Sequence, residues 1–251
     1  MTIESAFAIL WPALVAGLLV AATHVPLGMQ VLDRGIVFID LAVAQVAGLG
    51  VILADAFGWE PAGAAVQVVA VGAALGCALV LTWTERRWPE VQEAAIGTVF
   101  VLAASIAVLL LAKNPHGGEH LKDLLVGQIL WVGTAQLAVA ALATAGLLAL
   151  WFGLGARLGR AGFYAVFACA VTISVQLVGL YLVFITLVVP ALATWYARSR
   201  RLLRGYAIAA LGYGIGLAAS IGLDLPSGAV IVCAMALVAS AFALMGRALA
   251  R

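Results

Sequence analysis

Charged side chains are scarce in this sequence of 251 residues: Asp, Glu, Lys and Arg make up 10% of it, whereas hydrophobic residues make up 66%. A soluble domain carries roughly 25% charged residues, because polar groups must cover its surface. The shortage excludes a water-soluble fold, and we expect the lipid bilayer, and no nucleic acid, among its partners. The composition predicts an all-α fold, a polytopic transmembrane helical bundle that forms a single transmembrane domain over residues 1–251.

Cysteine pairs and long polar segments are also missing. Cys77, Cys169 and Cys233 each lie alone inside an apolar run, which excludes a disulfide framework or a cysteine metal set. The pattern G-x4-G-K-S/T of a P-loop is absent, and the breaks between apolar runs are too short for a nucleotide-binding or soluble catalytic domain. We therefore expect no enzyme activity and no bound cofactor. If ATP drives this protein, another chain hydrolyses it.

Long apolar runs fill the rest of the sequence and predict about eight or nine spanning helices. We expect the first run to be a retained helix rather than a cleaved signal peptide. A turn is expected at Gln176–Gly179, because the apolar stretch there is long enough to cross twice. The runs fall at about 6–22, 36–57, 62–82, 94–112, 130–152, 163–179, 180–197, 205–222 and 229–246.

The basic residues occupy alternate breaks between these runs. Eleven of the thirteen fall on one side, and only Lys113 and Lys122 fall on the other. The positive-inside rule places the larger group in the cytoplasm. With nine crossings, the N-terminus lies outside and the C-terminus inside; eight crossings result if one run is re-entrant. The larger group is Arg34, Arg86, Arg87, Arg157, Arg160, Arg198, Arg200, Arg201, Arg204, Arg247 and Arg251.

Asp40 is the one acidic residue well inside an apolar run. An ionisable side chain in hydrocarbon is costly and is a functional candidate by default, and a carboxylate suits hard or borderline divalent cations. Alternatively, Asp40 lies near the interface, where it pairs with Arg34 or caps a helix. Gln45 and Gln176 are amides in apolar runs, which either line a substrate path or hydrogen-bond between helices. His24, beside Pro26 at the end of the first run, is expected at the membrane interface.

The longest polar segment, Lys113 to Asp123, carries two of the three histidines. His116, Glu119 and His120 offer two imidazoles and a carboxylate, which suit zinc, manganese or iron. This segment is expected either to collect metal ions on the outer side or to be a plain solvated loop, as Gly117 and Gly118 favour.

Four stretches of this sequence resemble segments of the permease subunits of ABC importers for zinc, manganese and iron. Residues 34–45 look like R-x4-G-D-x-L-x-H-A, and residues 93–100 look like E-x-A-I-G-I-x-F. Residues 123–130 look like D-L-L-x-G-x-I-L, and residues 174–191 look like S-x-Q-x-V-G-x-L-L-V followed by P-A. The four stretches occur in the order that the family has them.

The resemblance implies a metal path that Asp40 lines. The family's histidine in that segment corresponds to Ala44, with Gln45 beside it. The family docks its ATPase through a cytoplasmic loop that corresponds here to residues 153–162, so Arg157 and Arg160 are the expected coupling residues. Positive-inside orientation alone would also leave them there.

The resemblance also implies an assembly in the bacterial cytoplasmic (inner) membrane. It comprises two copies of this chain, an ATP-binding subunit and an extracytoplasmic metal-binding protein. The expected substrate is a divalent metal ion, zinc or manganese. Three other readings stay open: an ABC permease for a metal chelate or a cobalamin-like molecule, a proton-coupled secondary transporter that uses Asp40 as its carrier, and a membrane scaffold with no transport role.

Overall fold

The computed structural model describes residues 3–59, 63–111, 125–197 and 199–248, and within these ranges it contains helices and no strand. Seven helical segments there are long and apolar enough to cross a membrane, which confirms the predicted all-α transmembrane bundle. The helices are α1 (Ile3–Arg34), α2 (Ile39–Ala56), α3 (Ala64–Arg87), α4 (Gln92–Leu111), α6 (Thr134–Val178), α7 (Leu180–Ala193), α8 (Arg201–Leu223) and α9 (Ser227–Ala248), with short 3-10 turns η1 (Pro89–Val91) and η2 (Ile129–Trp131).

Helix α1 is longer than the first apolar run predicted. It passes through Pro12 and Pro26 without a break, as membrane helices can when neighbouring groups compensate for the lost hydrogen bonds. His24 therefore lies inside the helix and is fully buried, so its expected place at the interface is wrong. The helix ends at Arg34, and the next residue, Gly35, has a φ of 69°. The Gly35 N–H donates to Leu32 O and the Ile36 N–H donates to Val31 O, the Schellman pattern of a helix end.

Helix α6 replaces an expected loop. Helical backbone continues through residues 153–162, and the chain bends at Gly159, whose φ of 61° and ψ of −161° are not helical. The bend separates two apolar segments, Thr134–Leu154 and Arg157–Val178. The expected pair of spans is present, but the connection is a bent helix.

A second break follows at Gly179, with a φ of 82° and a ψ of 165°. Helix α6 ends at Val178 and α7 begins at Leu180, so the turn predicted at Gln176–Gly179 is confirmed. The new helix is short, with 14 residues.

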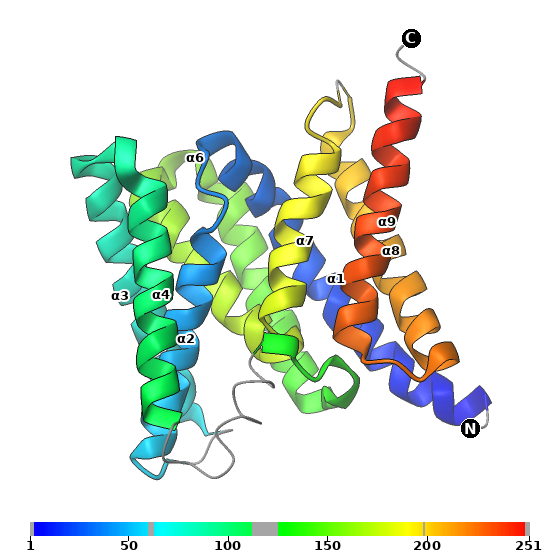
Figure 1. The fold of residues 1–251 in the computed structure, drawn as a ribbon, viewed down its shortest axis with the longest axis horizontal. Coiled ribbons are helices and arrows are strands. Elements are labelled where there is room, and N and C mark those ends of the chain that lie inside the picture. The colour runs from blue at the N-terminus through cyan, green and yellow to red at the C-terminus, as the bar shows by residue number, and fades with distance from the viewer. Residues whose placement is uncertain (1–2, 60–62, 112–124, 198, 249–251) are drawn as a thin grey trace.

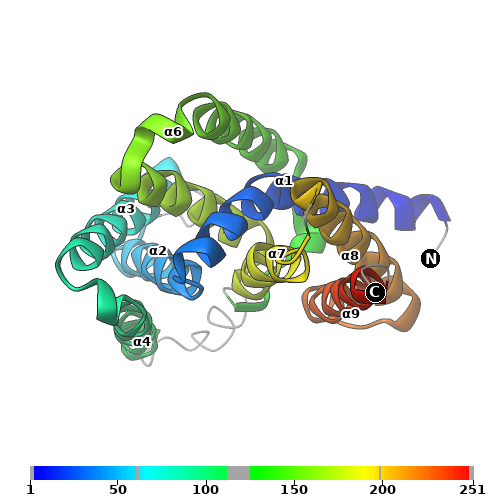
Figure 2. The ribbon, with the colours of Figure 1, turned by 90° about the horizontal axis from the view of Figure 1, so that it is seen from above.

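Successive helices alternate in direction, and the bundle has two flanks (Figure 1). Helices α2, α3 and α4 pack together on one flank, and α7, α8 and α9 pack together on the other. Figure 2 shows α1 and α6 running between the two flanks, and α1 packs on α6, α7 and α8. The bulkiest buried side chains include Phe163, Tyr164 and Phe167 from the second half of α6, so this segment lies at the centre of the core.

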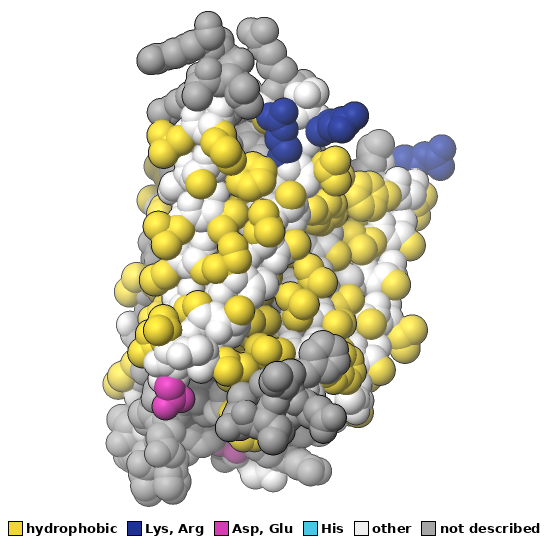
Figure 3. All heavy atoms as spheres, turned by 90° about the vertical axis from the view of Figure 1, so that its right-hand side faces the viewer, with side chains coloured by type: hydrophobic (Ala, Val, Ile, Leu, Met, Phe, Trp, Pro, Cys, Tyr) yellow, Lys and Arg dark blue, Asp and Glu magenta, His cyan; other side chains and the backbone are white. Residues whose placement is uncertain are grey.

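The two ends of the bundle differ in charge. The end of α1, the end of α3, the bend of α6 and the start of α8 lie at the upper end of the molecule in Figure 1, and all carry arginines. On the face drawn in Figure 3, basic side chains appear at this end, acidic ones at the other, and apolar ones between them. The described part of the chain thus has the charge distribution that the sequence predicted.

Candidate functional site

Asp40 is in the first turn of α2 and is 1% exposed. Neither of its carboxylate oxygens has a hydrogen-bond partner among the described residues. The donors that face it are the backbone N–H groups of Asp40 itself and Leu41, at the N-terminal, electropositive end of the helix. A buried, ionised carboxylate without a partner is strongly disfavoured unless a bound cation or a proton neutralises its charge.

The alternative pairing of Asp40 with Arg34 is not what the structure shows. The Arg34 guanidinium carbon lies 4.1 Å from the centre of the Phe163 ring, a cation–π contact with α6. The one ion pair between described residues joins Arg201 to Asp33, at 3.3 Å. Nor is Asp40 the N-cap residue: that residue is Phe38, whose side chain makes no cap hydrogen bond, and Asp40 lies two residues further into the helix.

Gln45 is a second buried polar side chain of α2. It is 3% exposed, and its Oε1 accepts no hydrogen bond within the part of the chain that the structure describes. Five residues separate the two side chains, roughly 140° around the helix. Helix α2 packs on α3, α4, α6 and α7, so both side chains face protein rather than lipid. One helix thus brings several unpaired oxygen ligands into the bundle.

Gln176 lies elsewhere. Its side chain is half-buried near the end of α6, and its backbone carbonyl accepts a hydrogen bond of 3.3 Å from Gln136 Nε2. Its proposed place in the substrate path stays a prediction.

His24 is the buried imidazole that sequence reasoning missed. Its Nδ1 lies 3.0 Å from both Val20 O and the Thr23 hydroxyl, while its Nε2 has no partner among the described residues. The signal that could have found it is the apolar pattern continuing beyond Pro26 to Val31, which places His24 within one long helix.

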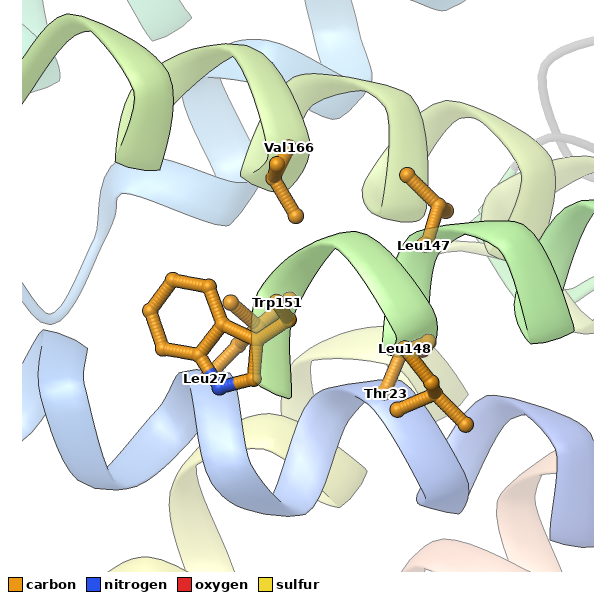
Figure 4. Close-up of a pocket in the computed structure, with 6 residues that line it drawn as sticks. All are labelled: Thr23, Leu27, Leu147, Leu148, Trp151 and Val166. Carbon is orange, nitrogen blue, oxygen red and sulfur yellow. The ribbon is translucent and has the colours of Figure 1, made fainter. Parts of the chain in front are cut away.

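A small pocket adjoins this segment between α1 and the two halves of α6. Thr23 supplies its one polar side chain, as Figure 4 shows, and the others are apolar. Such a lining does not suit an ion. The lining residues are Thr23, Leu27, Leu147, Leu148, Trp151 and Val166.

Two of the sequence segments singled out above meet in space through glycine. Gly127 has a φ of 71°, and its Cα faces the backbone of Val178 and Gly179 so closely that a side chain could not fit. A Cβ on Gly179 would in turn lie 2.7 Å from the carbonyl carbon of Val126, and one on Gly228 would lie 2.7 Å from Val126 O. Residues 125–130 and the segment around Gly179 therefore form one packed joint with the start of α9.

The remaining candidates divide in two. Arg157 and Arg160 are exposed beside the bend of α6, at the basic end of the molecule. His116, Glu119 and His120 lie outside the described residues. Within residues 3–59, 63–111, 125–197 and 199–248, no group of three or more His, Cys, Asp or Glu side chains is placed to hold a metal ion.

Comparison with known proteins gives a consistent result. The sequence matches the ABC 3 transport family over residues 6–154 and 148–246. An uncharacterized membrane protein of Synechocystis sp. is 29% identical over 243 residues, covering 88% of this chain and 84% of that protein.

Solved structures share the fold. PsaBC from Streptococcus pneumoniae, determined in complex with a Fab, matches with a TM-score of 0.75 and 20% identity over 97% of this chain and 95% of that one. An inward-facing ABC transporter of the metal-chelate type matches with a TM-score of 0.67 and 14% identity, covering 93% and 85% of the two chains.

Proposed function

The chain belongs to the ABC 3 transport family, and from this premise we propose that it is the permease subunit of an ATP-driven importer for a divalent metal ion. The observation that carries the proposal is Asp40, a fully buried carboxylate with no partner in the described structure. A cation that passes through the bundle supplies the positive counter-charge that this carboxylate lacks. The permease breaks no bond; it offers a path whose access alternates with the state of its ATPase.

The ligand chemistry favours a hard ion. Asp40 and Gln45 present oxygen atoms, whereas Ala44, buried on the same helix, stands where the family segment has histidine. Oxygen donors suit manganese better than zinc, which binds nitrogen and sulfur readily. We therefore place manganese first and zinc second.

A metal chelate is the second candidate, and the metal-chelate type transporter among the solved structures supports it. A chelated ion already has its ligands, so an unpaired carboxylate would gain less from it than from a bare ion. A proton-coupled carrier would also use Asp40, but the family match favours ATP-driven transport.

The proposed complex places the basic end of the bundle, with the C-terminus, in the bacterial cytoplasm. Arg157 and Arg160, at the bend of α6, then face the ATP-binding subunit. A second copy of this chain and an extracytoplasmic metal-binding protein complete the assembly.

The direct test is metal-dependent ATP hydrolysis. The chain is assembled in nanodiscs with the ATPase and binding protein encoded beside it, and the binding protein is loaded in turn with manganese, zinc, iron or cobalt. Stimulation by one free ion supports the proposal and identifies the substrate. Stimulation by a chelate alone supports the second candidate.

Asp40→Asn tests the carboxylate. We expect uptake to fall at least tenfold, because loss of even a group that only supports a metal ligand costs about that much, while thermal stability stays equal or rises because an unpaired buried charge is gone. Asp55→Asn, at the other end of the same helix, is the matched control and should keep wild-type uptake. Wild-type uptake by Asp40→Asn would remove Asp40 from the path.

The segment that carries His116 and His120 provides a separate prediction. If it collects ions, replacing both with Ala weakens uptake at low ion concentration only. Unchanged uptake at every concentration would make it a plain connector.

A further inference from the structure

A polar cluster at the basic end of the bundle joins three helices and is distinct from the Asp40 site. Its centre is Gln92, the first residue of α4, which is 4% exposed. Gln92 Nε2 donates to Leu81 O at 3.0 Å and to the Tyr164 hydroxyl at 3.3 Å, and Gln92 Oε1 accepts from the Thr84 hydroxyl at 2.9 Å. The amide therefore ties the end of α3 to the second half of α6.

Tyr164 lies just beyond the bend of α6. Gly159, five residues earlier, has a backbone conformation open essentially to glycine alone. No atom would lie within 4 Å of a Cβ there, so the outer side of Gly159 is open, while its neighbour Leu158 packs against the core. Tyr164 itself is 1% exposed and also faces the Glu85 carboxylate of α3. Tyr164 and its neighbour Phe163 are the fully buried residues that follow the bend, so they connect its movement to the core.

The cluster reaches the Asp40 segment by two routes. Glu93, next to Gln92 in the chain, is half-buried near the backbone of Val37, three residues before Asp40. Phe163, next to Tyr164, carries the Arg34 guanidinium on its ring, six residues before Asp40. The connection of residues 35–38 between α1 and α2 thus follows a residue held by α6 and lies near Glu93, the neighbour of Gln92.

We propose that Tyr164, Gln92 and Glu93 are positioning residues that transmit movement of the α6 bend to the segment that carries Asp40. The proposal rests on the proposed function, because it needs an ATPase that acts on the bend beside Arg157 and Arg160. Packed side chains and hydrogen bonds that form a continuous chain between two sites are the physical means by which such coupling is carried.

The first test compares two tyrosine variants in the assembled complex. Tyr164→Phe removes one oxygen from the cluster, and Tyr206→Phe removes an oxygen that donates to Ala22 O at 3.0 Å, between α8 and α1. We expect Tyr164→Phe to keep ATP hydrolysis and to lower ions imported per ATP by about fivefold, the effect of one buried hydrogen bond. Tyr206→Phe should leave that ratio unchanged. Equal ratios in the two variants would overturn the proposal.

A double-variant comparison separates coupling from general damage. Glu93→Leu removes the carboxylate that faces Val37, whereas Glu93→Gln keeps an oxygen there and should retain coupling. If both residues act in one connection, Tyr164→Phe combined with Glu93→Leu is no worse than the poorer single variant. Losses that multiply, or a Glu93→Gln variant as poor as Glu93→Leu, would overturn it.

A reporter that needs no transported ion distinguishes this inference from the proposed function. Cys77, Cys169 and Cys233 are replaced by Ala, and Phe38→Cys then places one thiol two residues before Asp40, where the side chain is half-exposed. Trapping the ATPase with ATP and vanadate should change the labelling rate of this thiol, and Tyr164→Phe should abolish that change. The coupling is overturned if trapping leaves the labelling rate unchanged in the protein with Tyr164 intact, or if trapping still changes that rate in the Tyr164→Phe variant. A complex that hydrolyses ATP but imports no ion overturns the proposed function and leaves this measurement to decide the coupling.

Discussion

Gly159 and Gly179 interrupt the helical backbone at the two ends of the second half of α6. Their backbone conformations are similar, with φ of 61° and 82° and ψ of −161° and 165°. Their surroundings are opposite. No atom would lie within 4 Å of a Cβ on Gly159, whereas Gly179 lies against the backbone of Val126 and Gly127. The conformational freedom of glycine thus has two uses here. At the basic end of the bundle it forms a hinge, and at the other end it forms a fixed joint.

The largest expected effect is from Gly179→Ala. The new Cβ would meet the Gly127 backbone, and the φ of 82° is strained for alanine. Strain and overpacking cost about 1–3 kcal/mol each. We expect little folded protein in the membrane and a clearly lower unfolding temperature in detergent, measured by size-exclusion chromatography after heating. A monodisperse variant of wild-type stability would show that the joint can open.

Gly159→Ala should have an intermediate effect. The unusual backbone conformation costs about 1–3 kcal/mol with a side chain, but no atom obstructs the Cβ. The protein should fold with a modestly lower unfolding temperature, and ion uptake should fall more than stability because the bend changes its angle. Ion uptake and the unfolding temperature of the same variant are measured in parallel to check this expectation. Loss of folded protein equal to that of Gly179→Ala would erase the distinction between hinge and joint.

Gly72→Ala should have the smallest effect. Gly72 is inside α3 and would meet nothing within 4 Å, so alanine improves helix propensity by up to about 1 kcal/mol. We expect wild-type uptake with an unchanged or slightly higher unfolding temperature. A substantial loss of either would reveal a close partner for this face that a single chain does not contain.

The sequence predicted what depends on local composition. Apolar runs locate most helices, and the arginines predict which ends lie together, because both follow from the cost of placing polar groups in hydrocarbon. Asp40 was singled out for the same reason, and its burial is confirmed.

Features that depend on tertiary contacts were not predicted. Pro26 looked like a break, yet α1 continues because neighbouring groups support it. Residues 153–162 carry polar side chains typical of a loop, but helical backbone persists around Gly159. The contact of Gly127 with Gly179 joins segments far apart in sequence, and no local pattern specifies such a pair.

The packing of α1 has a consequence for biogenesis. This helix precedes the other described helices in the sequence, but two of its main partners, α7 and α8, are synthesised only after α6. Until those helices are synthesised, the contacts of Gly28 with Leu187 and of Gly17 with Tyr213 cannot form. A chain that stops before α7 therefore leaves α1 without these partners, as a substrate for membrane quality control.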